Sequence, residues 1–175
     1  MICDYWSRED SSRHYDAGTS FQIARIDMVA NTGTYIDAPF HRYEEGADVS
    51  AVALERVADL PGTLVTANSD ERAIGPAVFD GVPLEGRAVI IRTDHSRHWG
   101  TPAYFEEHPF LTAAAAEYLR HRGPALVGID SLNIDDTRGG DRPVHSTLLG
   151  AGILIVEHLC NLDVLAGSLE GRGEF

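Results

Sequence analysis

The chain has 175 residues, of which 43% are hydrophobic, so it is long enough to bury a substantial core. Its formal net charge is −13 and all 14 basic residues are arginine. Nucleic acid is excluded as a partner, because phosphate binding needs a basic patch, and a chain without lysine cannot perform Schiff-base or P-loop chemistry. No apolar run approaches the roughly 18 residues that span a membrane. Without a signal peptide pattern, the sequence predicts a cytoplasmic protein.

The first half of the chain predicts an arm and the start of one domain. Residues 1–20 show no period and are expected to form an N-terminal arm, with residues 21–175 as the folded domain. Residues 21–29 alternate apolar and polar side chains, which predicts a strand with one buried face. Residues 49–60 carry apolar side chains at helical spacing and end at a Pro-Gly pair, which predicts a helix.

The second half predicts strands that alternate with helices. A short strand is expected at residues 63–66, and continuous apolar runs predict buried strands at residues 88–92, 125–129 and 153–156. Residues 109–122 are rich in alanine and end in basic residues before a glycine, as a helix does. This alternation predicts the α/β class in a single domain.

The carboxyl ends of the apolar strands carry polar side chains, at the edge where ligands collect in α/β sheets. Glu157 shares strand parity with Ile153 and Ile155, so its side chain is expected on their buried face. A carboxylate there needs a partner, a proton or a metal, unless the strand simply reaches solvent. His95 and Trp99 follow another strand and are expected to line a pocket, the alternatives being a surface histidine and a core tryptophan.

A polar stretch, residues 31–41, follows the first predicted strand. Asn31, Tyr35, Asp37 and His41 all occupy odd positions, and in extended chain such residues share one face. Gly33 lies among them without a side chain, where a ligand could approach closely. The stretch is therefore the first candidate for a functional site.

Residues 31–41 resemble the His-x-Gly-Thr-His-x-Asp-x-Pro-x-His motif of the cyclase family, which includes bacterial kynurenine formamidase and isatin hydrolase. Residues 92–100, 128–132 and 145–162 are similar to further segments of that family. The resemblance runs from about residue 21 to residue 165. It implies a swivelling β/β/α fold, a homodimer or higher homo-oligomer, and an enzyme that opens a small amide or lactam with metal-activated water.

The resemblance also implies roles for individual residues. Asp37, His145 and Glu157 would be metal ligands, and His41 would be the general acid/base. Asn31 and Tyr35 stand where the family motif has histidines. An amide oxygen is a weak ligand, and a phenol binds a metal well only when it is ionised.

Three states of the site follow from this departure. One divalent metal, zinc or manganese, would remain on Asp37, His145 and Glu157. An unusual site would recruit Asn31 and Tyr35 as ligands. A metal-free site would use His41 as the base, with Tyr35 donating a hydrogen bond to a developing oxyanion.

The leading functional hypothesis is a cyclase-family hydrolase that attacks the carbonyl of a small cyclic or N-acyl (amide, lactam or lactone) substrate with activated water. Asn31, His95 and Trp99 would line its substrate pocket. The alternatives are a metal-independent cyclase or lyase of secondary metabolism, and a relative that binds a small molecule without turnover. An incomplete sheet edge near the C-terminus also favours a homo-oligomer.

Overall fold

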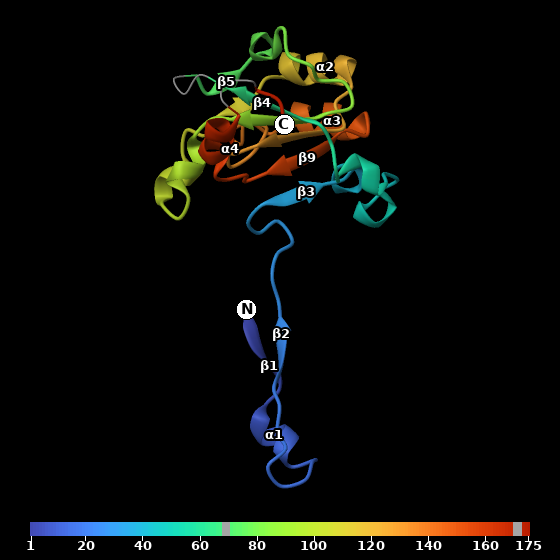
Figure 1. Cartoon of the computed structure of the whole chain (residues 1–175), viewed down its shortest axis with the longest axis vertical. Helices are drawn as coiled ribbons and strands as arrows, with labels where there is room; N and C mark the ends of the chain where they lie inside the picture. Colours follow the sequence, from blue (N-terminus) through green and yellow to red (C-terminus); the bar gives the residue numbers. More distant parts are fainter. Residues whose placement is uncertain (68–70, 170–172) are drawn as a thin grey trace. The chain divides into compact units, whose positions relative to one another are not determined.

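A five-stranded mixed sheet forms the centre of residues Gly33–Phe175, in the order β3-β9-β8-β6-β4 (Figure 1). Four neighbouring strands run parallel to one another: β4 (Gly62–Thr66), β6 (Ala88–Arg92), β8 (Leu126–Ile129) and β9 (Leu154–Glu157). The edge strand β3 (Tyr35–Asp37) pairs antiparallel with β9. This computed structural model describes residues 1–67, 71–169 and 173–175. The four strands predicted from residue 63 onward are confirmed to within one or two residues at each end.

Two helices, α2 (Ala113–Arg122) and α3 (Pro143–Gly150), cover one face of the sheet (Figure 1). Their apolar side chains pack onto alternate strand residues in the larger core cluster, which includes Val89, Ile91, Val127, Ile129, Ile155, Leu119, Val144 and Leu148. The other face is covered by a smaller cluster in which Ala38 packs with Leu126 and Leu154. The chain that follows β3 therefore lies on the face opposite the two helices.

The helix α2 begins and ends as its sequence dictates. The hydroxyl group of Thr112 accepts a hydrogen bond from the amide of Ala115 (3.2 Å), and Gly123 adopts the left-handed conformation (φ 63°) that ends many helices. The predicted helix started at residue 109, but Phe110 and Leu111 form β7 instead, which pairs with β5 (Ala73–Ile74). Tertiary pairing thus shortens the helix by one turn.

The helix predicted over residues 49–60 was wrong. The structure has two single 3-10 turns there, Val49–Ala51 and Leu54–Arg56, separated by extended backbone at Val52 (ψ 124°). The carboxylate of Asp48 accepts hydrogen bonds from the amides at 50 and 51, which closes the first turn. Three β-branched valines lower the helix propensity of this segment, and little of it is buried.

Residues Met1–Thr32 form a separate compact unit. Its strands β1 (Ile2–Trp6) and β2 (Ile23–Ile26) form an antiparallel hairpin around a short helix, α1 (Arg8–Ser12). The ring of Trp6 contacts three other rings at the closed end of the hairpin, those of His14, Tyr15 and Phe21. The strand predicted over residues 21–29 is therefore shorter than expected, and its four residues are all exposed, so the predicted buried face was wrong. Ordered structure also precedes this strand, where the sequence shows no period.

The remaining elements are short. The described residues form one more helix, α4 (Leu162–Ser168), and further 3-10 turns at Pro39–His41, Pro76–Phe79, His95–His98 and Pro102–Phe105. Residues 173–175 extend the sheet beyond β4, because the amide of Leu64 donates to the carbonyl of Gly173 (2.7 Å). Within the described ranges, the structure contains no helix of the length and apolarity needed to cross a bilayer.

Candidate active site

Asp37 and His41 come together through a turn and not through an extended strand. Asp37 ends β3, and Pro39 then begins the 3-10 turn Pro39–His41 because its ring fixes a helical φ. The turn brings His41 Nδ1 to 3.3 Å from Asp37 Oδ1. The expectation that His41 shares an extended face with Tyr35 was therefore wrong in its geometry, although the turn places His41 beside Asp37.

His145 approaches the same carboxylate from the first turn of α3. Its Nε2 atom lies 3.6 Å from Asp37 Oδ2 and 3.7 Å from Glu157 Oε1. Among the described residues, Asp37, His41 and His145 also offer ligand atoms that all lie within 4.8 Å of one another. The structure thus gathers four of the residues singled out from the sequence around one point.

The carboxylate of Asp37 has an unsatisfied atom at that point. Asp37 is only 5% exposed, and its Oδ2 atom has no hydrogen-bond partner among the residues that the structure describes. A buried carboxylate oxygen without a donor is costly, so a native site normally supplies it with a proton, a water molecule or a cation. The orphaned atom faces His145 Nε2, at the centre of the cluster.

Glu157 occupies the buried end of β9, as its strand parity predicted. It is fully buried, and the amide of Ile134 donates to its Oε1 atom (2.7 Å). The hydroxyl group of Tyr35 donates to its Oε2 atom, and Asn133 Nδ2 lies 3.5 Å from the same oxygen. Burial raises the pKa of Glu157, against the opposing effects of the His145 charge and the Tyr35 hydrogen bond.

The charge of His145 is set by competing effects. Burial lowers its pKa, but the hydrogen bond of Asp135 and the nearby carboxylates of Asp37 and Glu157 outweigh that effect and raise the pKa to about 9. Without a metal, the imidazole is therefore a cation at neutral pH, surrounded by three carboxylates. The surrounding carboxylates thus stabilise a positive charge at this point, which either an imidazolium or a bound metal ion can supply.

A pocket of about 190 Å³ opens next to Tyr35. Its lining is Gly33, Thr34, Ser96, Trp99, Tyr104, His158, Leu159 and Cys160. The ring of His158 lies 5.3 Å from that of Tyr35, and its Nδ1 atom is hydrogen-bonded to the Tyr104 hydroxyl (2.7 Å). The pocket is thus a mainly apolar recess at the Glu157 end of the cluster.

Two of the three predicted pocket residues can be placed in relation to this recess. Trp99 lines it and is 58% exposed. His95 does not line it: the residue is buried, and its Nε2 atom lies 2.9 Å from the carbonyl oxygen of Tyr104, behind the recess. Asn31 belongs to the Met1–Thr32 unit, so its role in a substrate pocket stays a prediction.

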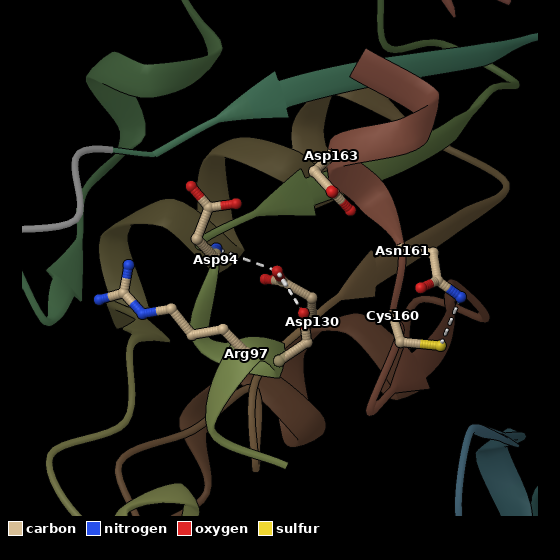
Figure 2. A pocket seen from close by; sticks show the side chains of 7 residues that line it. Asp94, Arg97, Asp130, Cys160, Asn161 and Asp163 are labelled. Carbon is tan, nitrogen blue, oxygen red and sulfur yellow. Dashed lines mark hydrogen bonds between the residues drawn. The ribbon is translucent and has the colours of Figure 1, made fainter. Parts of the chain in front are cut away.

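Figure 2 shows a second, polar pocket, with a volume of about 330 Å³. Ser96 and Cys160 line both this pocket and the first. Figure 2 shows Asp130 against the loop that carries Asp94. The Asp130 carboxylate accepts hydrogen bonds from the Thr93 amide and hydroxyl (both 2.7 Å) and from the Asp94 amide (3.0 Å). Asp130 therefore holds the loop after β6 in place, and burial raises the pKa of its carboxyl group.

Sequence reasoning missed Asp135, which contacts His145 directly. Asp135 Oδ2 lies 2.6 Å from His145 Nδ1, and the aspartate is completely buried. The sequence shows it only as part of a charged, glycine-rich loop. One signal could have found it: a helix that starts at a proline without a capping residue needs an acceptor from elsewhere.

Comparison with known proteins shows which family the chain resembles. A family model named Cyclase matches residues 4–136. The kynurenine formamidase of Bacillus cereus is 29% identical over 166 residues, which are 94% of this chain and 74% of that protein. A solved structure described as a potential metal-dependent hydrolase with cyclase activity has a TM-score of 0.71 at 33% identity, covering 81% of this chain and 68% of that one.

The fold is also that of isatin hydrolase A from Labrenzia aggregata. That structure has a TM-score of 0.71 at 24% identity, over 94% of this chain and 71% of that chain. The α/β, cyclase-like fold expected from the sequence is thereby confirmed. Since the family model spans more than half of the chain, the protein belongs to the cyclase family.

Proposed function

We propose that this cyclase-family hydrolase opens the carbonyl-to-heteroatom bond of a small cyclic or N-acyl substrate, an amide, lactam or lactone, with activated water. The observation that carries the proposal is the convergence of Asp37, His145 and Glu157 around Asp37 Oδ2, an atom without a hydrogen-bond partner in the described part of the chain. Similarity to kynurenine formamidase, at 29% identity, favours an amide among these substrates.

The residues present fit a single divalent metal. The orphaned oxygen of Asp37, the Nε2 atom of His145 and the Oε1 atom of Glu157 are the carboxylate and imidazole donors that zinc and manganese prefer. When bound, a divalent ion acts as a Lewis acid and lowers the pKa of water toward about 7. Tyr35 uses its hydroxyl proton on Glu157, so this site supports one ion better than two.

His41 is the residue we assign to proton transfer. Its Nδ1 atom is held 3.3 Å from Asp37 Oδ1, its side chain is 44% exposed, and its ring lies 5.7 Å from the ring of His145. The aspartate orients the imidazole, and the free edge of the ring remains open to water and substrate. His41 would take the proton of the attacking water and return it to the leaving nitrogen or oxygen.

Tyr35 assists through Glu157. Its hydroxyl group donates to the buried carboxylate, which keeps Glu157 Oε1 turned toward His145. To donate to a developing oxyanion instead, as we expected from the sequence, Tyr35 would have to release that hydrogen bond during the reaction. The substrate would bind in the neighbouring recess with its ring against Trp99 and His158.

The test combines metal content with turnover. The purified protein is dialysed against micromolar zinc or manganese, and bound metal is counted by atomic emission. The protein is then assayed on an N-formyl anilide, a lactam and an aryl lactone. Close to one metal per chain and metal-dependent turnover of one of these substrates supports the proposal. Turnover without metal favours the metal-independent enzyme, and neither metal nor turnover favours the binding relative.

We also propose a cytoplasmic homo-oligomer. Cys3 and Cys160 are exposed free thiols, which fits a reducing compartment. A two-stranded hairpin is marginally stable alone in water, and β1 and β2 expose Ile2, Tyr5 and Ile26 within their own unit. Light scattering tests the assembly: a single-chain mass at micromolar concentration would contradict it.

A further inference from the structure

Asp135 makes three contacts with the start of α3, and all of them are buried. One carboxylate oxygen accepts the amide of Val144 (2.7 Å). The other accepts the amide of His145 (3.0 Å) and lies 2.6 Å from the Nδ1 atom of the same residue. Asp135 itself is fixed, because its own amide donates to Asn133 Oδ1 (2.9 Å).

These contacts replace a missing helix cap. The capping position of α3 is Arg142, whose side chain makes no capping hydrogen bond, and Pro143 follows it without an amide proton. The first two amides of the helix, those of Val144 and His145, therefore depend on Asp135. The carboxylate reaches the helix from the loop after β8, so the helix start and the loop are held together.

The third contact determines which ring nitrogen of His145 carries the proton. An ionised carboxylate only accepts hydrogen bonds, so the Nδ1 atom beside Asp135 must carry the proton. The neutral ring has one proton, which leaves a free electron pair on Nε2. That atom faces Asp37 Oδ2 at 3.6 Å and Glu157 Oε1 at 3.7 Å.

We propose that Asp135 is a positioning residue of this site, which holds His145 in the Nδ1-protonated tautomer and turns its Nε2 atom toward Asp37 and Glu157. The inference rests on the metal site proposed above. A carboxylate behind a metal-binding histidine fixes the ring and raises its basicity, and loss of such a partner commonly costs 10- to 100-fold in metal affinity. The competing explanation is that Asp135 only caps α3.

The variant Asp135→Asn separates the two roles. With its amide oxygen in the place of Oδ1, asparagine still accepts the Val144 amide, and its NH₂ group then takes the place of Oδ2 and donates to His145 Nδ1. The imidazole proton would move to Nε2, where it blocks a metal. Asp136→Asn is the matched control, since the Asp136 carboxylate accepts from the Arg138 amide and has no contact with His145 among the interactions described.

Two measurements decide the proposal. Zinc affinity is measured by competition with a chromophoric chelator, and the tautomer of His145 is read from ring ¹⁵N chemical shifts. We expect Asp135→Asn to weaken zinc binding by about 10- to 100-fold and to shift the ring proton to Nε2. Asp136→Asn should bind zinc within about twofold of the parent protein, the scatter expected for a remote site.

Other results would overturn the proposal that Asp135 positions His145. If Asp135→Asn lowers stability but keeps its zinc affinity and the Nδ1–H tautomer, Asp135 is only a helix cap. If the variant does not fold, the parent protein decides: metal-free, at a pH where the ring is neutral, His145 must carry its proton on Nδ1. The ¹⁵N measurement on the parent protein also separates the positioning role of Asp135 from the metal site. If the parent protein does not bind zinc, the metal site is contradicted, but the tautomer of His145 can still be measured.

Discussion

Tyr35 and Glu157 are direct partners in the antiparallel pairing of β3 with β9, and the hydroxyl group of Tyr35 donates to the Glu157 carboxylate. The pair joins residues 122 positions apart in the sequence. A phenol stands here where the family motif has a histidine, and it provides Glu157 with a hydrogen-bond donor that needs no metal. In the metal site that we propose, Tyr35 therefore supports the ligand Glu157 through a hydrogen bond and does not itself bind the ion.

Replacing Tyr35 by phenylalanine should destabilise the metal-free protein. The change leaves a buried carboxylate with one donor fewer, at a cost of about 1–3 kcal/mol, and urea denaturation followed by circular dichroism measures it. Tyr43→Phe is the control, since the Tyr43 hydroxyl donates to the Ser146 carbonyl in an exposed setting. Equal losses in the two variants would show that Glu157 does not depend on Tyr35.

Asp37→Asn should separate stability from function. The variant removes a buried negative charge whose Oδ2 atom has no donor among the described residues, but it also removes a carboxylate that faces the His145 cation. We expect these effects to offset each other, so that the metal-free protein unfolds at about the same urea concentration as the parent. Zinc binding should fall by more than about 100-fold and turnover with it, because a coordinating carboxylate is lost. Asp80→Asn, at an exposed site, should change neither property. A variant that keeps its metal would remove Asp37 from the ligand set.

Gly46→Ala should disturb the turn that carries His41. A Cβ atom at Gly46 would lie 2.6 Å from the backbone carbon of Pro39, where no flexible side chain can move away. We expect a loss of about 1–3 kcal/mol in stability and reduced turnover. Gly139→Ala is the matched control, because its Cβ atom would meet nothing nearer than 3.9 Å. Unchanged activity in Gly46→Ala would mean that the turn adapts without moving His41.

The buried His95 should make stability fall in mild acid. Burial lowers the pKa of His95, and nearby His98 and Arg97 act in the same direction, while the contact with the Tyr104 carbonyl and the charge of Asp130 oppose them. The unfolded chain takes up a proton near the ordinary pKa of 6.5, whereas the folded chain resists it. The stability from the neutral ring is thus complete above that pH and is lost as the pH falls below it.

The variant His95→Gln tests this dependence. Its amide group can still donate toward the Tyr104 carbonyl, and it cannot titrate. We expect a shallower fall in melting temperature between about pH 7 and pH 5 than in the parent protein. His121→Gln, at an exposed position, should keep the parent slope. Parallel slopes for all three proteins would contradict a role for His95 in the acid sensitivity.

The sequence predicted the strands and the buried acidic residue because each depends on local pattern. The apolar runs that became β6, β8 and β9 are continuous, and the parity of Glu157 with Ile155 follows from the pleat alone. The cap at Thr112 was also readable, since it needs only its own helix.

The missed features depend on contacts between distant segments. Helical spacing over residues 49–60 competes with the capping carboxylate of Asp48, which closes a single turn instead. Asp135 acquires its role only when the loop after β8 meets the start of α3. His41 joins Asp37 through a turn, where parity along a strand does not apply.

The pairing of β3 with β9 also has a consequence for how the protein matures. β3 leaves the ribosome well before its partner β9, and such distant pairings form slowly. A nascent chain of about 150 residues already contains Asp37 and His145, yet it lacks the strand that holds β3 in the sheet. The candidate site therefore assembles only after β9 has been made, so the order of synthesis delays its formation until β3 and β9 pair.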